Sequence, residues 1–406
     1  MTARTGVLSL ALVIGITLAV PLAWAGAQSA SNGPSLVPAT SWGLISVAQS
    51  SASNIMAVGY SLEPTTAPVG LLYNGDSWTV TPMPHPSGGA LLYSVTSVPG
   101  TGDFIAGGET CNATACTQAY LLEWNGSSWT HMPLPALTNS TDIASVSASG
   151  PNDAWATGQT CNNTKYTCKV LLLHWNGSAW SKTTLPGSIN DIYPDIYGVD
   201  DISPTDAWAV GESFLGALAL NWNGHKWSNV PSPGTGGFTE GFTAVSGIPS
   251  TSEIWTIEAA SGGQLMEKWN GSSWRGFNLP GYVPGGYSTD DYDGVSASST
   301  SNAWVVGDYL SKSGTEPALT AQFNGKTWTQ VATPNSHPTD ELFSVTASGA
   351  GAITVGVGLS PLEPNIATGL VYTWGGTSWT STKVPTPDVP SGSTEHAGRF
   401  TEAKKF

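Results

Sequence analysis

The amino-acid sequence predicts an all-β protein, folded as one seven-bladed β-propeller of four-stranded antiparallel blades. Charged residues make up 10% of the 406 residues, against about 25% in ordinary globular proteins, whereas the chain has 48 glycines and 18 tryptophans. That composition favours strands and turns over charge-rich helices. A hairpin motif that occurs seven times is the second observation, and four short apolar segments accompanying each copy are the third.

The hairpin motif consists of an aromatic residue, Asn-Gly in most copies, two further residues and a closing tryptophan, as in WNGSSW at residues 124–129. Successive closing tryptophans lie 47 to 54 residues apart, at Trp78, Trp129, Trp180, Trp227, Trp274, Trp328 and Trp379. Asn-Gly between apolar runs predicts a β-hairpin, because both residues tolerate the positive φ of a tight turn. A repeat of about 50 residues without a helix-length segment indicates propeller blades.

Each copy is expected to contain four strands, A to D. Strand A has a small residue before its central valine, because innermost strands converge on the axis; these residues are Ser46, Ser94, Ser145, Gly198, Ala244, Gly294 and Ser344. Strand B, typified by DAWAVG at residues 206–211, alternates tryptophan with small neighbours, so adjacent blades can interdigitate. Strands C and D flank the hairpin and alternate with period two.

The first copy, LLYNGDSWTVTPMP at residues 71–84, runs from an apolar strand through an aromatic residue and a tryptophan to a proline-bearing exit, and the second strand B ends in Gly107-Gly108. In this order the repeat resembles the kelch and galactose-oxidase class of propellers. Most copies have one glycine where kelch repeats have two, and the fifth copy has Glu258 there. The resemblance implies the propeller fold and, because such propellers host many functions, little else.

Residues 1–25 have the parts of a signal peptide: Arg4, an apolar run at residues 6–20 and a small-residue cleavage site at residues 23–25. The run is shorter than the roughly 20 residues that span a bilayer, and an uncleaved anchor is the alternative. We therefore expect a secreted protein, extracellular or at the cell surface, without membrane attachment after cleavage.

The remaining boundaries follow from the repeats. Residues 26–41 are expected to be a linker or a segment that closes the ring, residues 42–387 the propeller, and residues 388–406 a C-terminal tail. Within the first segment, SLVPAT at residues 35–40 resembles the exit of a strand D, so it is a candidate to pair beside the seventh blade.

The four cysteines are expected to form two disulfides, as suits an oxidising compartment. Cys111 and Cys116 lie between strands B and C of the second copy, and Cys161 and Cys168 lie at the equivalent place in the third. Pairing within each loop is the simplest arrangement, and a bridge between neighbouring blades is the alternative. Either arrangement pins loops on the face that also carries the D-to-A connections.

Charge and motifs exclude several classes of function. A net charge of −15 would repel the phosphate backbone of a nucleic acid. The chain has no GxSxG, HExxH or GxxxxGKS motif. After the predicted signal peptide only Arg275 and Arg399 remain, too few for the arginine clamp of a sialidase-type propeller. We expect a monomer without a cofactor, and calcium is the one ion that the sequence leaves open.

Acidic residues recur four positions before the strand-A valine, on the face that carries the loops. With two nearby aromatic residues, they are the predicted ligand-binding residues: Asp142, Asp195, Tyr197, Asp291, Tyr292 and Glu341. Carboxylates so arranged can accept hydrogen bonds from sugar hydroxyls or bind a hard cation such as calcium. They also fit ordinary solvated strand starts in an acidic protein, and that alternative stays open.

These observations predict a non-catalytic propeller that binds a carbohydrate or an extracellular protein. The first alternative is a glycan-cleaving hydrolase or lyase that uses two of the carboxylates as acid and base. The second is a structural surface protein, which would have no concave polar site. The tryptophans are expected to pack between blades, because each blade has one at a fixed strand position.

Overall fold

The computed structural model describes residues 35–112, 115–162, 167–190, 194–232, 241–260, 263–281, 290–360 and 366–391. The chain divides into two units, residues 1–33 and 34–406, and the second contains all the described residues. The predicted signal peptide lies outside them. Within the described part of the chain, no helix has the length and apolar character that a membrane span requires.

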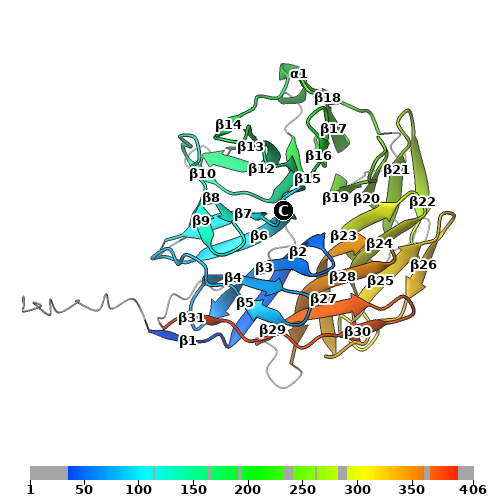
Figure 1. Cartoon of the computed structure of the whole chain (residues 1–406). Helices are drawn as coiled ribbons and strands as arrows, with labels where there is room; N and C mark the ends of the chain where they lie inside the picture. The colour runs from blue at the N-terminus through cyan, green and yellow to red at the C-terminus, as the bar shows by residue number, and fades with distance from the viewer. Residues whose placement is uncertain are drawn as a thin grey trace, which may run out of the picture. The chain divides into compact units, whose positions relative to one another are not determined.

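The second unit is a ring of seven antiparallel blades, which confirms the predicted fold class; the blades follow one another around a common centre (Figure 1). The first four blades consist of β2 (Ser41–Ser51), β3 (Asn54–Glu63), β4 (Ala67–Tyr73) and β5 (Trp78–Val80); β6 (Ala90–Ser97), β7 (Phe104–Cys111), β8 (Cys116–Trp124) and β9 (Trp129–His131); β11 (Ser145–Gly150), β12 (Asp153–Asn162), β13 (Thr167–Trp175) and β14 (Trp180–Lys182); and β15 (Asp195–Ser203), β16 (Asp206–Ser213), β17 (Gly216–Trp222) and β18 (Trp227–Asn229).

The last three blades consist of β19 (Gly241–Gly247), β20 (Ile254–Ala260), β21 (Gly263–Trp269) and β22 (Trp274–Asn278); β23 (Asp290–Ser299), β24 (Asn302–Tyr309), β25 (Ala318–Phe323) and β26 (Trp328–Val331); and β27 (Thr339–Ser348), β28 (Gly351–Leu359), β29 (Ala367–Trp374) and β30 (Trp379–Ser381). A short β10 (Ser140–Thr141) also pairs with β12, and α1 (Gly187–Asn190) lies between the third and fourth blades. Because strands alternate in direction, B-to-C hairpins and D-to-A connections share one face of the ring.

The C-to-D hairpins explain the repeated motif. In every blade the closing tryptophan starts strand D directly opposite the aromatic residue that ends strand C, as Trp124 pairs with Trp129. In the first blade the Asn74 side-chain oxygen accepts the backbone N–H groups of Asp76 and Ser77, each at 3.0 Å, and five more asparagines do the same. The glycine of each hairpin takes positive φ, for example +97° at Gly75, whereas the asparagine before it does not.

Tryptophans pack the blades together, as the sequence predicts. Trp255 of strand B lies 4.9 Å from Phe323 and 5.3 Å from Trp328 between ring centroids, which are the hairpin aromatics of the next blade. Trp155, Trp208 and Trp304 make the same contacts with their own next blades. All four are at most 2% exposed, so they form core and not a ligand platform.

Side-chain oxygens of strand A bridge every blade interface. In four interfaces the serine before the central valine accepts the N–H of the next blade's valine: Ser46 from Val95, Ser94 from Val146, Ser145 from Val199 and Ser344 from Val47, at 3.0 to 3.3 Å. In the other three interfaces, the acceptor lies just after the valine: Asp200 for Gly247, Ser246 for Ala297 and Ser296 for Ala347. Strand A is the inner edge of each sheet, and these contacts satisfy its unpaired N–H groups.

The ring closes through the two ends of the described chain. Strand β1 (Leu36–Pro38) pairs with β31 (Asp388–Pro390), a segment that the sequence analysis assigned to the tail. The Ala39 N–H donates to the Pro387 carbonyl, and the Thr40 N–H donates to the Glu63 carbonyl of the first blade, both at 2.9 Å. Each blade therefore keeps its own four strands, and a separate two-stranded clasp holds the first and seventh blades together.

Candidate ligand-binding site at the channel mouth

A cavity of about 190 Å³ lies on the ring axis, lined by strand A of all seven blades. The small residue before each valine contributes to its wall. One position nearer the strand start, on the side of the loop-bearing face, the side chains vary between copies: Ile45, Tyr93, Ala144, Tyr197, Thr243, Asp293 and Phe343. The repeats agree where the strands must converge and differ at the mouth, which marks the mouth as the candidate site.

Tyr93 connects the cavity wall to a buried carboxyl. Its hydroxyl donates to Glu109 Oε1 at 2.7 Å, and Glu109 is 9% exposed. Burial raises the pKa of Glu109 to about 7; the nearby Asp142 also raises it, whereas the hydrogen bond from Tyr93 opposes the shift. Glu109 is therefore only partly ionised at neutral pH.

Gln159 joins two of the predicted carboxylates into a short polar chain. The Gln159 backbone N–H donates to Asp142 Oδ1 at 2.6 Å, and its side-chain amide donates to Asp195 Oδ1 at 3.1 Å. Burial raises the pKa of both carboxyls. Burial also raises the pKa of Tyr197, which lines the cavity, and the neighbouring carboxylates of Glu212 and Asp195 raise it further.

The other predicted residues lie elsewhere. Tyr292 is 1% exposed in a hydrophobic cluster, and its hydroxyl points to the Pro280 carbonyl at 3.3 Å. Asp291 is exposed and accepts a hydrogen bond from Gln264 at 3.1 Å. Glu341 is 1% exposed. Of the six predicted residues, only Tyr197 lines the cavity. Asp142 and Asp195 precede the lining residues Ala144 and Tyr197 by two positions, and Gln159 joins them; the other three predicted residues lie apart.

Strand B supplies the partners that sequence reasoning missed. Glu109, Gln159 and Glu212 each follow the glycine of their strand B, and strand A lies opposite them, as Asp195 lies opposite Glu212. The sequence does contain this signal, a polar residue directly after the strand-B glycine. It points to the site because this end of strand B lies on the face of the D-to-A connections, away from the hydrophobic core.

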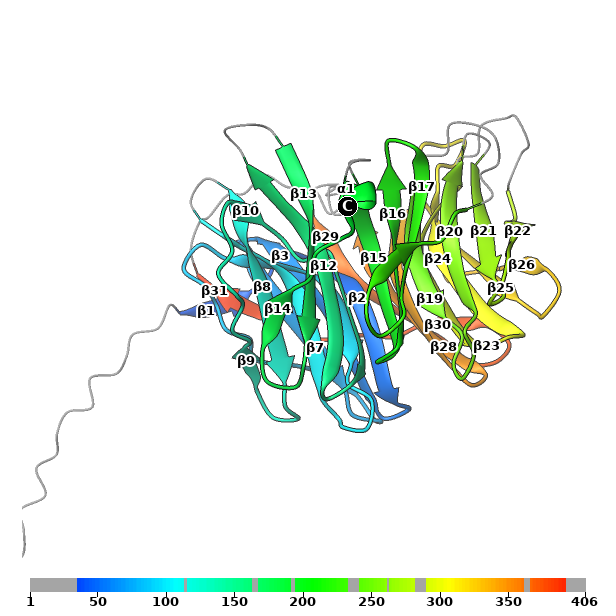
Figure 2. The same cartoon turned by 90° about the horizontal axis from the view of Figure 1, so that it is seen from above.

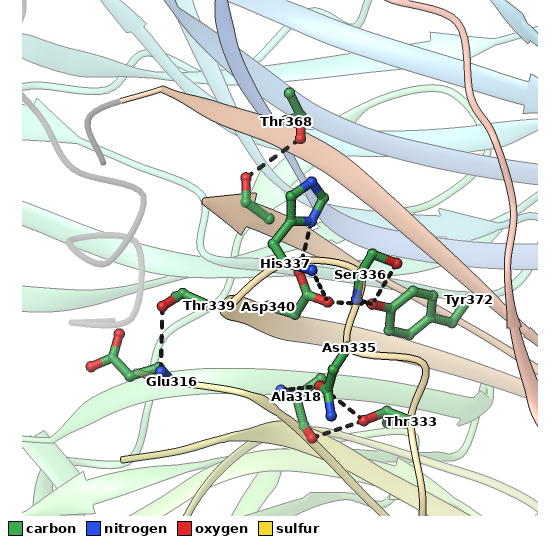
Figure 3. Close-up of polar contacts among 11 residues, drawn as sticks. Glu316, Ala318, Thr333, Asn335, Ser336, His337, Thr339, Asp340, Thr368 and Tyr372 are labelled. Carbon is green, nitrogen blue, oxygen red and sulfur yellow. Dashed lines mark hydrogen bonds and ion pairs between the residues drawn. The ribbon is translucent and has the colours of Figure 1, made fainter. Parts of the chain in front are cut away.

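A second polar group anchors the connection into the seventh blade (Figure 3). Asp340, which is fully buried, accepts hydrogen bonds from His337 Nδ1 at 2.9 Å and from the hydroxyl of Tyr372. A side chain on Gly358 would collide with the His337 ring, so this glycine makes room for it. These contacts fix the loop that leads into β27, and we assign them a structural role.

Carboxyls also gather on the opposite face, between blades three and four. His174 Nε2 lies 2.6 Å from Asp153 Oδ1, and Ser149 links Asp153 to Asp201 through its hydroxyl and its N–H. Burial, together with Asp153, raises the pKa of Asp201 to about 9, so this group is neutral at pH 7. The His174 ring stacks on Trp155 at 4.2 Å, which makes the group part of the blade interface.

The cysteines pair as the sequence predicts, within their own loops. Cys111 bonds Cys116 and Cys161 bonds Cys168, each across the B-to-C hairpin of one blade. Among the described residues, no group of three or more His, Cys, Asp or Glu is placed to hold a metal ion.

No protein-family model and no curated protein matches the chain. Solved structures resemble it at low identity. "YCF48 bound to D1 peptide" is 15% identical with a TM-score of 0.49, covering 79% of this chain and 93% of that one. SapL1 lectin in complex with alpha methyl fucoside is 10% identical, with a TM-score of 0.46 and coverage of 86% and 98%. The six-bladed Aleuria aurantia lectin is 13% identical, with a TM-score of 0.43 and coverage of 88% and 100%. At these values the likeness concerns the fold alone.

Proposed function

We propose that this propeller is a non-catalytic binding protein whose ligand sits at the channel mouth against blades two to four. The observation that carries the proposal is the pair of cavity-lining tyrosines: Tyr93 donates to Glu109 of strand B, and Tyr197 lies close enough to Glu212 of strand B for that carboxyl to raise its pKa. Aromatic rings beside hydrogen-bonding groups in a concave site are typical of ligand pockets. Such a site also favours binding over a purely structural role.

The chemistry of the mouth limits the ligand to a carbohydrate or a protein that presents donors or positive charge. Carboxylates accept hydrogen bonds from hydroxyls, ammonium groups and guanidinium groups, and no lysine or arginine lines the described cavity. An anionic group would be repelled by Asp293 of the cavity wall and by the carboxylates of Asp142 and Asp195, which precede the lining residues Ala144 and Tyr197 by two positions. The cavity is smaller than the roughly 300 Å³ of common ligand pockets, so it suits one sugar unit or one side chain.

Glu109 favours one alternative, a glycan-cleaving enzyme. A carboxyl with a pKa of about 7 beside a second carboxyl, Asp142, has the unequal protonation that acid and base roles require. Release of reducing ends from a glycan, abolished by Glu109→Gln, would establish this alternative.

We also propose that the protein is exported, that it is a monomer and that its repeats are related to kelch repeats. The two disulfides support an oxidising compartment, and hence a secreted or cell-surface protein.

The proposal is tested by probing a glycan array and a panel of extracellular proteins with the full chain. We expect Asp195→Asn and Tyr197→Phe to weaken binding about tenfold or more, because each removes a hydrogen-bonding group at the mouth. Asp291→Asn is the matched control, since this exposed carboxylate lies outside the polar chain. Binding that survives the first two substitutions and is lost in the control would place the site elsewhere.

The pH dependence provides a second readout. Glu109 gains its negative charge as the pH rises through about 7, so affinity for a hydrogen-bond donor or a cation should increase between pH 6 and pH 8. Glu109→Gln should flatten that dependence. A wild-type affinity that falls over this range would contradict the assignment.

A further inference from the structure

The hairpin between β16 and β17 ends in two exposed apolar residues. Phe214 is 87% exposed and Leu215 is 75% exposed, so their side chains are almost entirely in water. In the side view the hairpin reaches the same edge of the ring as α1, the face of the channel mouth (Figure 2). Scattered exposed apolar residues are ordinary, but an adjacent aromatic and aliphatic pair at a loop tip marks an interaction site.

The tip is held rigidly. Ser213 Oγ donates to the Gly216 carbonyl at 3.1 Å and accepts the Leu215 N–H at 3.2 Å, and Gly216 takes φ +105°, which a side chain would disfavour. Ser213 and Gly216 are also paired across the hairpin. The backbone of the turn is thus constrained, which lowers the backbone entropy lost when a partner binds the two apolar side chains.

The same strand connects the tip to the mouth. Glu212, a neighbour of Tyr197 of the cavity wall, precedes Phe214 by two residues, and Phe214 and Leu215 form the turn that follows β16. An extended peptide presents the side chains at positions i and i+2 on one face, about 7 Å apart, so one short peptide can offer a side chain to each place.

We infer that the mouth and the Phe214–Leu215 tip form one interface for an extended protein segment that carries a basic residue and, two positions away, an apolar residue. The inference rests on the proposed function, and of the two proposed ligand classes, carbohydrate and protein, it selects protein. The basic side chain meets the carboxylates of Asp195 and Glu212, while the apolar one packs on the tip. Charge complementarity selects this partner, because the same carboxylates and a net charge of −15 oppose an anionic lipid surface.

A positional array of hexapeptides tests the inference with the full chain as the probe protein. We expect selection of Arg or Lys at one position and of Leu, Ile, Met or Phe two positions away. The best hexapeptide is then titrated calorimetrically against variants. Phe214→Ser with Leu215→Ser should weaken binding about tenfold or more, and Leu310→Ser, which alters another half-exposed leucine, should not.

The outcomes separate the two proposals. Loss of peptide binding in Asp195→Asn with none in the tip variant would keep the mouth as the site and overturn the inference. Selection of peptides without a basic residue, or binding to glycans alone, would also overturn it. Sedimentation with phosphatidylcholine vesicles that depends on Phe214 and Leu215 would make the tip a membrane contact, and the protein partner would be wrong.

Discussion

At the scale of single residues, a glycine in strand B makes room for the backbone of strand A in six of the seven blades. A Cβ on Gly211 would lie 1.9 Å from the Asp195 carbonyl oxygen, and five other blades have the same close approach. The cause is an irregular register in strand A, seen between Ile196 and Gly198 in the fourth blade. The fifth blade has Glu258 at this position, and there Gly241 of strand A takes φ +127° instead. The close approach of the strand-A backbone therefore explains why six of the strands B have a glycine at this position.

Gly211→Ala should destabilise the protein by about 2 kcal/mol or more, because the obstacle is a backbone carbonyl that cannot rotate away. Gly150→Ala is the control, since a Cβ there meets no atom within 4 Å. The free energies of unfolding in urea would measure both. Equal losses in the two variants would show that the close approach does not matter.

At the scale of elements, adjacent positions of strand A have different functions, one in the blade interface and one at the cavity. Its serines bridge to the next blade, and the residues just before them face the cavity mouth, as Ser94 and Tyr93 do in the second blade. The sequence shows a small residue at the position of these serines in every copy and explains it by crowding of the innermost strands at the axis. It does not show that the serines form hydrogen bonds. The serine oxygen matters because edge strands at the axis have N–H groups without a ladder partner.

Ser46→Ala should lower stability by about 1 kcal/mol, since the Val95 N–H loses its acceptor in the blade interface. Ser188→Ala in α1, at an exposed position, is expected to change stability by less than about 0.5 kcal/mol. Thermal unfolding midpoints of the two variants check this. Equal thermal midpoints for Ser46→Ala and Ser188→Ala would show that the serine bridges do not stabilise the ring.

The candidate site also depends on elements that meet. Asp142 and Asp195 were predicted from their place in strand A, but Gln159, which bonds both, comes from strand B of the third blade. Tyr292 is predicted as an aromatic neighbour of the acidic residue Asp291, and it lies in the core instead. Sequence position gives the face of the ring, whereas the direction of each side chain depends on the local register between strands A and B.

At the scale of the whole molecule, closure joins residues more than 300 positions apart. The clasp of β1 and β31 ties together the ends of a ring whose blades otherwise contact their neighbours in sequence. Val389 of β31 is fully buried in the cluster that includes Trp42 and Val371, so the clasp adds apolar contacts to both end blades. Without it the first and seventh blades would keep their packed faces, the Ser344 bridge and the hydrogen bond from the Ala367 N–H to Ser41 Oγ.

Removing residues 388–406 should lower the thermal midpoint by several degrees, because β31 and the buried Val389 are lost. Removing only residues 392–406 leaves the clasp intact and is the matched control. Limited proteolysis should cut the first variant near Ser35 more readily than the second. Identical midpoints for the two truncations would mean that the ring closes without the clasp.

By itself the sequence determined the number of blades, the strand order and the packing role of the tryptophans, because repetition and two-residue alternation are properties of the chain read locally. It also favoured local pairing of the cysteines, which the structure confirms. Only the tertiary structure decided how the ring closes, which serines bridge blades, that Gln159 joins Asp142 to Asp195, and that Tyr292 is buried. Those features need segments from different blades to meet, and the distances between them are set by the geometry of the closed ring.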